Sequence, residues 1–155
     1  MKTRSSKFRK SWLNPKIEIR PSSTHGRGLF ARVPMAKGEV VVVWFAGSGY
    51  VRKSGEDPSY FRNHSCDPNT WMKDEVTSTA RRNIKANEEL TIDYATYIAN
   101  ENRIIIEKCK CGSANCRKRI RGRDWRRRDL QEQYRGHFLP IINKRIATQQ
   151  ARSKA

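Results

Sequence analysis

The stretch NHSCDPN, residues 63–69, gathers an amide, an imidazole, a hydroxyl and a thiol around a single proline. Three interpretations compete. His64 and Cys66 could form a nucleophile with its base, the thiol could bind a metal ion, or the segment could be a polar turn without chemistry. The positions of the other cysteines help to decide among them.

The chain has four cysteines, and three of them lie in one run, CKCGSANC, residues 109–116. A disulfide between Cys109 and Cys111 would close a very tight ring, and thiols inside a cell stay reduced. Zinc in closed structural sites takes four thiolates in a tetrahedron. Cys66 is the remaining thiol for a fourth ligand. The spacing therefore predicts a zinc site of Cys66, Cys109, Cys111 and Cys116, and the alternative is four unrelated reduced cysteines.

A zinc site at Cys66 changes the interpretation of NHSCDPN. A hydrolytic pair of His64 and Cys66 would need an orienting group in space, which adjacency in sequence does not supply. If Cys66 binds zinc, Asn63 and His64 lie beside an anchored point where their side chains can be held for a ligand. The alternative for His64 is a histidine whose hydrogen bonds are satisfied in the core.

Length and charge limit the class of protein. A chain of 155 residues suits one domain with its own core. The 33 Lys and Arg outnumber the 15 Asp and Glu, so acidic partners are expected. No apolar run approaches the roughly 20 residues that span a bilayer, and MKTRSSKFRK lacks the apolar region of a signal peptide. We therefore expect an intracellular protein without a membrane partner, in the cytoplasm or nucleoid of a bacterium or in the nucleus of a eukaryote.

The positive charge is concentrated at the two ends of the chain. Residues 1–20 hold seven Lys or Arg and one acid, and residues 103–155 hold sixteen Lys or Arg and four acids. Such basic flanks are typical of solvated arms that bind nucleic acid without sequence preference. The alternative is that they only make the protein more soluble.

Hydrophobic alternation and turn residues predict short strands up to residue 97. A polar turn, PSSTHGRG, separates the first two of these strands. The predicted strands are KIEIR at 16–20, LFARV at 29–33, a buried strand from Glu39 to Phe45, a pair within 71–84, and ELTIDY at 89–94.

The C-terminal third changes to a helical period. Asp124 is predicted to be the N-cap of a helix that runs through Leu130 and Tyr134 and stops near Gly136. A second helix is predicted to begin at Pro140. Its apolar stripe, which we expect to pack on the domain rather than lie on a membrane, consists of Ile141, Ile142, Arg145 and Ile146.

Taken in order, several separated segments resemble the SET-domain protein lysine methyltransferases. NHSCDPN matches the family's N-H-S-C-x-P-N completely. The resemblance covers roughly residues 16–120, and the segment from Asp124 to Ile146 resembles the helical extension of small bacterial members. The other similar segments are HGRGLFA at 25–31, Phe45-Ala46-Gly47, NEELTIDY at 87–94, and CKCGSANCRK at 109–118, which resembles the post-SET zinc motif.

The resemblance implies a mainly β SET fold. It would consist of several small β-sheets around a pseudoknot, followed by a C-terminal post-SET zinc segment and one or two short C-terminal helices. The expected organisation is a basic N-terminal arm at 1–15, the SET domain at 16–97, the post-SET zinc segment at 98–120, and a basic helical extension at 121–155.

The resemblance also implies a protein-lysine N-methyltransferase that uses S-adenosyl-L-methionine and holds zinc only for structure. Tyr94 resembles the family's catalytic tyrosine beside an aromatic channel, and Trp125 would cover the adenine of the cofactor unless it is a helix core residue. Tyr50, Tyr60 and Tyr97 are candidate channel walls. The cofactor would further be held by Arg27, Gly28, Leu29, Asn63 and His64.

Three positions depart from the family pattern. Phe45 stands where tyrosine is usual, Arg62 replaces a common apolar residue, and Asn87 replaces a glycine. The insert between Gly47 and Tyr60 is very short, in a region that helps the family bind its substrate peptide. Substrate choice is therefore the least determined property.

Two classes of function follow from this resemblance. The first is an active methyltransferase that acts on an accessible lysine of a protein associated with DNA or RNA, such as a chromosomal or ribosomal protein. The second is an inactive SET-fold zinc protein that binds nucleic acid. The presence of Asn63, His64 and Tyr94 favours the enzyme.

Overall fold

The structure is a computed structural model that describes residues 11–44 and 57–154. Residues 1–10 of the expected basic arm lie outside the described residues. So do Tyr50 and the segment Phe45-Ala46-Gly47 that resembles a family motif.

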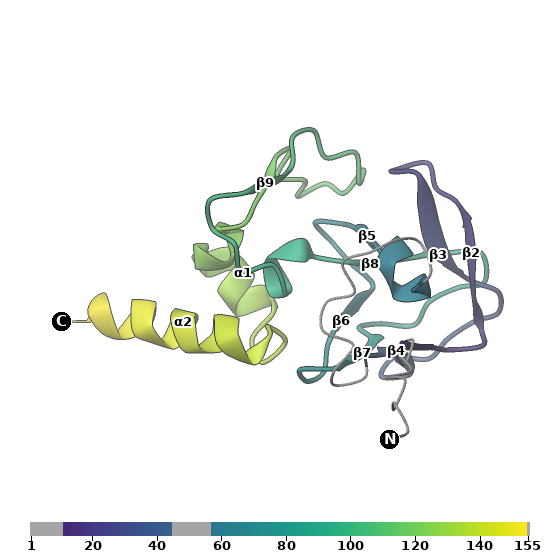
Figure 1. Ribbon diagram of the computed structural model, residues 1–155, viewed down its shortest axis with the longest axis horizontal. Helices are drawn as coiled ribbons and strands as arrows, with labels where there is room; N and C mark the ends of the chain where they lie inside the picture. The colour runs from purple at the N-terminus through teal and green to yellow at the C-terminus, as the bar shows by residue number, and fades with distance from the viewer. Residues whose placement is uncertain (1–10, 45–56, 155) are drawn as a thin grey trace, which may run out of the picture.

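Small β-sheets organise the described chain before residue 107 (Figure 1). Strand order is β1-β4-β7-β6 in one four-stranded sheet, β2-β3-β8-β5 in the other, and β10-β9 in a two-stranded sheet. This confirms the mainly β architecture predicted from the sequence. The strands are β1 Trp12–Leu13, β2 Ile17–Pro21, β3 Arg27–Ala31, β4 Val40–Val43, β5 Asn63–His64, β6 Thr70–Met72, β7 Thr77–Ala80, β8 Glu89–Ile92, β9 Ile104–Ile106 and β10 Ile120–Arg121.

The helices are short except for the last one, which points away from the sheets in Figure 1. Among the described residues, no helix has the length and apolar character needed to cross a bilayer. The 3-10 helices are η1 Pro58–Phe61, η2 Tyr94–Thr96 and η3 Asp124–Arg126, and the α-helices are α1 Arg128–Gln133 and α2 Pro140–Arg152.

The first hydrophobic core is built from residues of the two four-stranded sheets and the segments that join them. Alternation along β3 buries Leu29 and Ala31 completely, and the β-branched run in β4 buries Val41 and Val42. Burial of such side chains is worth roughly 1.5–3 kcal/mol each. The buried members of this core are Ile17, Leu29, Ala31, Met35, Val41, Val42, Ala80, Ile84 and Leu90.

The register of one strand pair brings the two most distinctive motifs of the sequence together. β5 runs parallel to β8, with Asn63 opposite Thr91 and His64 opposite Ile92. Because strand β8 leads directly into η2, the start of NHSCDPN lies beside Tyr94.

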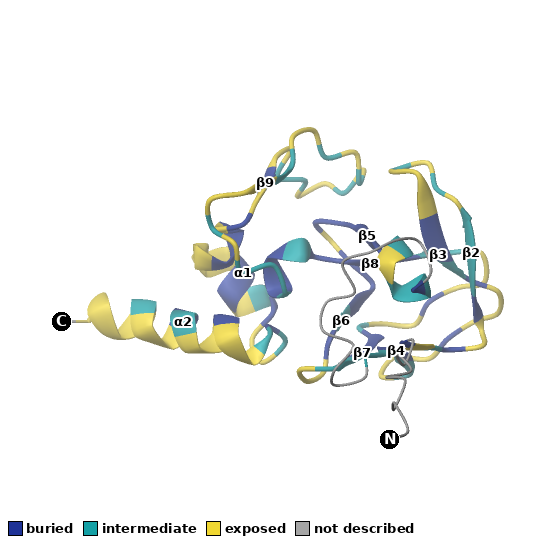
Figure 2. Ribbon diagram, in the orientation of Figure 1, coloured by how far each residue is buried: buried dark blue, intermediate teal, exposed yellow. Residues whose placement is uncertain are grey.

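The C-terminal helices form a second core with η2, and Figure 2 shows buried residues on α1, whereas α2 is mostly exposed. The backbone N–H of Leu139 donates to the Thr96 carbonyl at 2.9 Å. This contact attaches the extension to the segment that carries Tyr94. The buried members are Ala95, Trp125, Leu130, Tyr134, Phe138, Ile142 and Ile146.

Two details of the predicted helices are wrong. Asp124 is not an N-cap, because α1 begins at Arg128 and the Asp124 carboxylate instead accepts hydrogen bonds from Arg117 and from the backbone of Arg121. The predicted apolar stripe of α2 also includes a residue that is exposed. The helix begins at Pro140 as predicted, but Ile141 is 54% exposed. The buried residues of the helix are Ile142 and Ile146.

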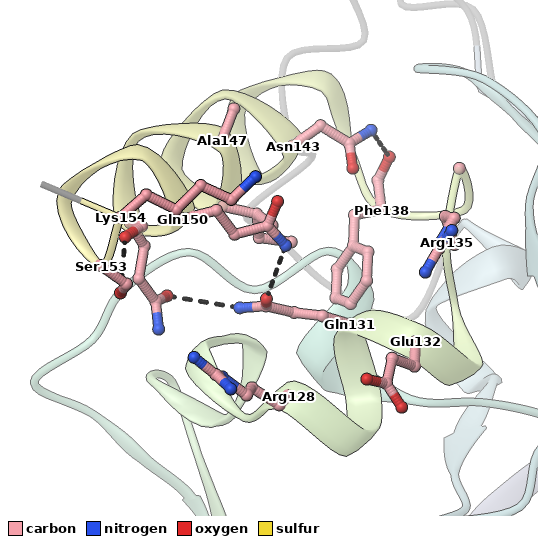
Figure 3. A pocket seen from close by; sticks show the side chains of 13 residues that line it. Arg128, Gln131, Glu132, Arg135, Phe138, Asn143, Ala147, Gln150, Ser153 and Lys154 are labelled. Atoms are coloured by element: carbon pink, nitrogen blue, oxygen red, sulfur yellow. Dashed lines mark hydrogen bonds between the residues drawn. The ribbon is translucent and has the colours of Figure 1, made fainter.

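A groove of about 600 Å³ lies between α1 and α2 (Figure 3). The Gln131 side chain lies across it, since its Nε2 donates to Gln149 Oε1 at 3.3 Å and its Oε1 accepts from Gln150 at 3.1 Å. Three cations and one carboxylate are found along the walls, namely Arg128, Arg135, Lys154 and Glu132. The groove is therefore polar and predominantly positive.

We expect Gly122→Ala to prevent stable folding. A Cβ at this position would overlap the backbone carbonyl of Asn100, and a main-chain atom cannot rotate away as a side chain can. Gly122 also donates its N–H to the Arg103 carbonyl at 2.8 Å, so it cannot move freely. The expected loss exceeds about 3 kcal/mol, the upper end for overpacked cores. Thermal and urea unfolding followed by circular dichroism measures it.

The matched control is Arg123→Ala, at the adjacent exposed position. This variant should stay within about 0.5 kcal/mol of the parent protein. Equal stability of both variants would contradict the close chain crossing at Gly122.

Candidate functional site

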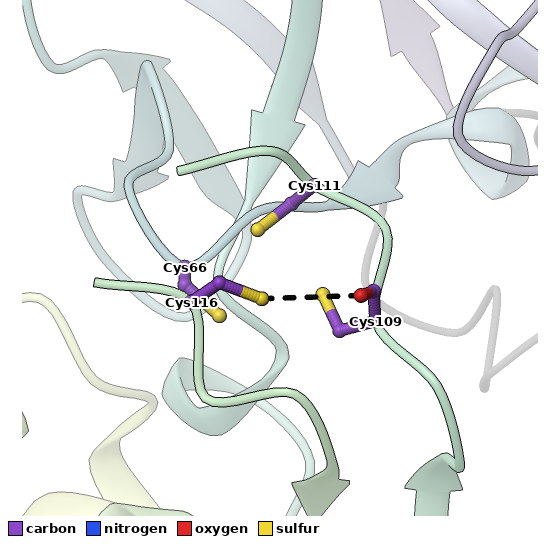
Figure 4. Close-up of side chains that lie close together, drawn as sticks. All are labelled: Cys66, Cys109, Cys111 and Cys116. Atoms are coloured by element: carbon purple, nitrogen blue, oxygen red, sulfur yellow. Dashed lines mark hydrogen bonds between the residues drawn. The ribbon is translucent and has the colours of Figure 1, made fainter. Parts of the chain in front are cut away.

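Four thiols from two distant parts of the chain converge at one point (Figure 4). Cys66 comes from the loop after β5, and the other three come from the segment between β9 and β10. All four sulfur atoms lie within 4.8 Å of one another. The predicted set of Cys66, Cys109, Cys111 and Cys116 is thus brought together, with Gly112 at φ +73° making the turn inside the local run.

The chemistry of this cluster fits zinc. Burial raises the pKa of the Cys66 thiol far above its usual range and that of Cys109 to about 11, so without a cation both would remain protonated. Burial acts in the same direction on Cys111, but hydrogen bonds from Ser113 and the neighbouring backbone outweigh it and lower the pKa of Cys111 to about 6. Four sulfur ligands at this spacing are the donor set of closed tetrahedral zinc sites.

A buried ion pair connects the thiol cluster to the strand end that carries Tyr94. The Arg117 guanidinium donates to both carboxylate oxygens of Asp93, at 2.6 and 2.7 Å, and to Asp124 at 3.2 Å. Arg117 follows the last cysteine directly, and its own N–H points at Cys66 Sγ at 3.3 Å. Asp93 precedes Tyr94 and is fully buried. The ion pair thus fixes the segment that carries Cys109, Cys111 and Cys116 against the candidate site.

The role of this pair was not predicted from the sequence. Arg117 was only one of several cations beside the cysteines, and Asp93 was part of a motif. The sequence did contain one indication of this ion pair. Arg117 directly follows the last cysteine and Asp93 directly precedes Tyr94, and the predicted zinc site would bring these two positions together.

A cavity of about 440 Å³ lies next to the thiol cluster. Its walls come from β5, from the turn between β2 and β3, from Tyr94, and from the segment around β9, which Figure 1 draws above β5. The cavity is lined by Thr24, His25, Asn63, His64, Tyr94, Ile105, Ile106, Glu107, Lys108, Cys109, Lys110 and Cys111.

Asn63 fixes the turn before β3 against β5. Its Nδ2 donates to the carbonyl oxygens of His25 and Arg27, each at 3.0 Å, and to Glu89 Oε1 at 2.8 Å. Gly28 completes this close packing, because a Cβ there would overlap the Glu89 carboxylate. The turn therefore presents its main chain to the cavity in a fixed position.

His64 is held in one tautomer. Its Nδ1 accepts a hydrogen bond from the backbone N–H of Tyr94 at 3.2 Å, so the proton is on Nε2, which lies 3.3 Å from Cys66 Sγ. Burial lowers the pKa of His64 to about 4, in spite of the nearby Asp93. The ring is neutral near pH 7 and links β5, Tyr94 and the thiol cluster.

Tyr94 turns its hydroxyl toward the main chain before β5. The hydroxyl donates to the Arg62 carbonyl at 3.2 Å. Its ring packs at a centroid distance of 5.2 Å from His64 and 5.5 Å from Tyr97, which makes an aromatic corner at the cavity. Burial raises the pKa of Tyr94, so the phenol keeps its proton near neutral pH.

Other predicted site residues lie outside the cavity lining, and their roles stay predictions. Arg27 is exposed with its guanidinium over the Phe61 ring, and the Leu29 side chain belongs to the first core. Trp125 is buried in the second core. Tyr60, a candidate channel wall, is 68% exposed.

Comparison with known proteins matches residues 50–95 to the SET domain. This part of the chain is similar to a SET domain. It is 28% identical to the human histone-lysine N-methyltransferase SETD1B, over 76% of this chain and 7% of that protein. It is 38% identical to the H3 lysine-9 specific histone-lysine N-methyltransferase SUVH1 of Nicotiana tabacum, over 42% of this chain and 10% of that protein. The chain therefore corresponds to a small part of the length of these curated relatives.

Two solved structures share the fold. One is KRYPTONITE in complex with mCHG DNA and SAH, with a TM-score of 0.55 and 24% identity over 69% of this chain and 29% of that one. The other is the methyltransferase domain of human SETMAR, with a TM-score of 0.52 and 18% identity over 70% of this chain and 58% of that one. The resemblance predicted from the motifs is confirmed.

We expect the isolated protein to contain one zinc ion per chain and Cys66→Ser to reduce this content strongly. The variant removes the ligand that joins two distant segments, so it should also lower the free energy of unfolding by several kcal/mol, on the order seen when folding depends on zinc. Elemental analysis by mass spectrometry and urea unfolding with and without a chelator measure both effects.

Ser113→Ala is the matched control. It removes the hydroxyl that lies 2.8 Å from Cys111 Sγ but leaves four thiols. It should retain zinc. If a chelator leaves the urea unfolding of the parent protein unchanged, the structural metal site is contradicted.

Proposed function

We propose that this SET protein is a protein-lysine N-methyltransferase that uses S-adenosyl-L-methionine. The proposal depends on one observation: Asn63, His64 and Tyr94 line the same cavity. The four-thiol cluster lies beside this cavity and joins two of its walls. The histone-lysine methyltransferase relatives and the SAH in the KRYPTONITE structure support the same reaction class.

The cavity suits the cofactor in size and in lining. It offers carbonyl groups on the rigid turn before β3, the neutral ring of His64, and the cations Lys108 and Lys110 near Glu107. We propose that main chain at Arg27 to Leu29 and the pair Asn63 and His64 hold the cofactor, whereas the burial of Trp125 in the second core supports the alternative role of a helix core residue. Once bound, S-adenosyl-L-methionine supplies an electrophilic methyl group on a sulfonium.

The residues of the chain orient the amine and the methyl group and exclude water from the cavity. An amine must approach the methyl in line with the bond that breaks, and fixing that geometry supplies much of the rate. Tyr94 and Tyr97 form an aromatic corner that can guide a lysine side chain. Because the Tyr94 phenol keeps its proton and uses it in a hydrogen bond to the Arg62 carbonyl, its oxygen lone pairs are left to interact with groups that enter the cavity.

Zinc in this proposal has a structural role. Cys66, Cys109, Cys111 and Cys116 would hold it, and the ion would close the cavity by tying the segment after β9 to the loop after β5. The buried pair of Arg117 and Asp93 then carries this constraint to Tyr94.

We propose a lysine on a protein associated with nucleic acid as the acceptor. The relatives act on histones by name, and this chain carries a formal net charge of +18, which attracts polyanions and the proteins bound to them. Basic arms on the enzyme could dock on the same nucleic acid as the substrate.

The decisive variant is Tyr94→Phe. It removes one hydroxyl that interacts with the Arg62 carbonyl and leaves the ring in place. Methyl incorporation should fall at least about 100-fold, comparable to the loss of one oriented group at a reacting centre, while cofactor binding survives. Labelled cofactor, recombinant histones and a whole-cell extract, with mass spectrometry of modified lysines, measure the first effect, and calorimetry measures the second.

The control is Thr148→Val, which removes a hydroxyl at an exposed position on α2. Its activity should match that of the parent protein. Equal incorporation by the parent and Tyr94→Phe would refute the role of Tyr94.

The groove between α1 and α2 favours nucleic-acid binding as a second function, with or without turnover. Arg128, Arg135 and Lys154 surround a polar hollow that could accept a phosphate backbone. Substituting all three by alanine should weaken binding to a 20-base-pair duplex and reduce the salt slope by about 0.9 for each lost phosphate contact. Fluorescence anisotropy over a range of salt concentrations measures both quantities.

The matched control replaces Arg82, Arg81 and Arg119, which pair with Glu88, Asp67 and Glu107 on other surfaces. It removes the same formal charge. Equal weakening by both triple variants would show that total charge, rather than the groove, governs binding.

A further inference from the structure

Arg62 places a positive charge inside the protein next to the candidate site. The residue is 5% exposed and lies directly before Asn63, at a position where the sequence pattern of the family has an apolar side chain. Its guanidinium lies over the Trp44 ring at 5.0 Å from the centroid, and its Nη1 donates to Ser78 Oγ at 2.5 Å. Both partners are uncharged.

Two carboxylates of the neighbouring elements have other partners. Asp57 accepts hydrogen bonds from Ser11 and Ser59, and Glu89 accepts from Ser22 and Asn63. Within residues 11–44 and 57–154, no carboxylate forms an ion pair with Arg62, and its Nε has no hydrogen-bond partner. Burying a cation is costly, and the described residues supply no charged partner that would offset this cost.

The main chain of Arg62 contacts the Tyr94 hydroxyl directly. That hydroxyl donates to the carbonyl of Arg62 itself at 3.2 Å. Tyr94 and Tyr97, both at η2, are the titratable groups among the described residues that interact electrostatically with the guanidinium, and Glu89 acts on Tyr94 from β8 with the opposite sign. Burial lowers the pKa of Arg62 to about 10, so it remains charged near neutral pH.

We propose that Arg62 is an electrostatic positioning residue that disfavours a second positive charge beside Tyr94 and so keeps a bound acceptor amine neutral. The inference rests on the proposed function. A free lysine amine has a pKa of about 10.4 and is almost fully protonated at pH 7, whereas only its neutral form has the lone pair for attack. A nearby like charge favours loss of the proton, which passes to solvent water. Each further methylation of the same lysine needs this loss again.

The first test measures the field of Arg62 without turnover. Trifluorotyrosine incorporated at position 94 has a phenol that ionises near neutral pH, and ¹⁹F NMR follows its titration in the zinc-loaded protein. Because a cation stabilises phenolate, Arg62→Met should raise the midpoint by about one pH unit. Arg62→Gln keeps a donor for Ser78 and serves if the methionine variant is unstable. Arg62→Lys keeps the charge and should move the midpoint less.

Two controls isolate the effect. Trifluorotyrosine at the exposed position 60 should titrate identically in all variants, and Arg82→Met, which removes an exposed charge, should leave the position 94 titration unchanged. A midpoint at position 94 that does not respond to loss of the Arg62 charge overturns the proposal, whether or not methyl transfer is detected.

The second test concerns the acceptor amine. Methylation of histone H3 at saturating cofactor should rise with pH as the amine loses its proton, and the midpoint of this rise should move to higher pH in Arg62→Met and Arg62→Gln. A merely structural role would lower the rate without moving the midpoint, and that result overturns the proposal for the amine. Absence of transfer by the parent protein counts against the proposed function instead, and the phenol titration then decides on Arg62.

Discussion

The bidentate ion pair between Arg117 and Asp93 is the constraint on which the site depends. Arg117 adjoins a thiol ligand, and Asp93 adjoins Tyr94, so a single buried interaction transmits the position of the thiol cluster to the cavity. Asp93 also accepts a hydrogen bond from Tyr134 in the second core at 3.1 Å. Removing one member of such a pair would leave an uncompensated buried charge, which costs more than an exposed salt bridge contributes. The segment with the three local cysteines, the helical extension and the cavity therefore form one cooperative unit.

The protonation states of the site form a consistent picture. His64 is neutral, the Tyr94 phenol is protonated, and Arg62 is charged, all near pH 7. This arrangement places oxygen atoms and aromatic faces at the cavity and a cation behind them. In the proposed reaction, this field would favour a neutral amine before transfer, and the surrounding oxygens and π faces would accommodate the positive charge that passes from donor to product.

Local patterns allowed much of the fold to be predicted. β-branched alternation identified β2, β4 and β8, and Pro140 marked the start of α2. The thiol cluster was predictable because three cysteines were local and only Cys66 remained. Long-range pairing was not predictable: Asp124 looked like a helix cap, but its carboxylate is used by Arg117. The burial of Arg62 likewise depends on Trp44 and Ser78, which are distant in sequence.

The separation of the four thiols along the chain has a consequence for synthesis. The ligand after β5 emerges from the ribosome more than 40 residues before its three partners, so until residue 116 has been made the first ligand has no site to complete. During that interval the sheets can already pack around their own core, because their contacts are internal to the earlier segment. Assembly of the cavity thus has to follow the synthesis of residue 116, and under the proposed zinc site the supply of metal ion would set how quickly the cavity closes.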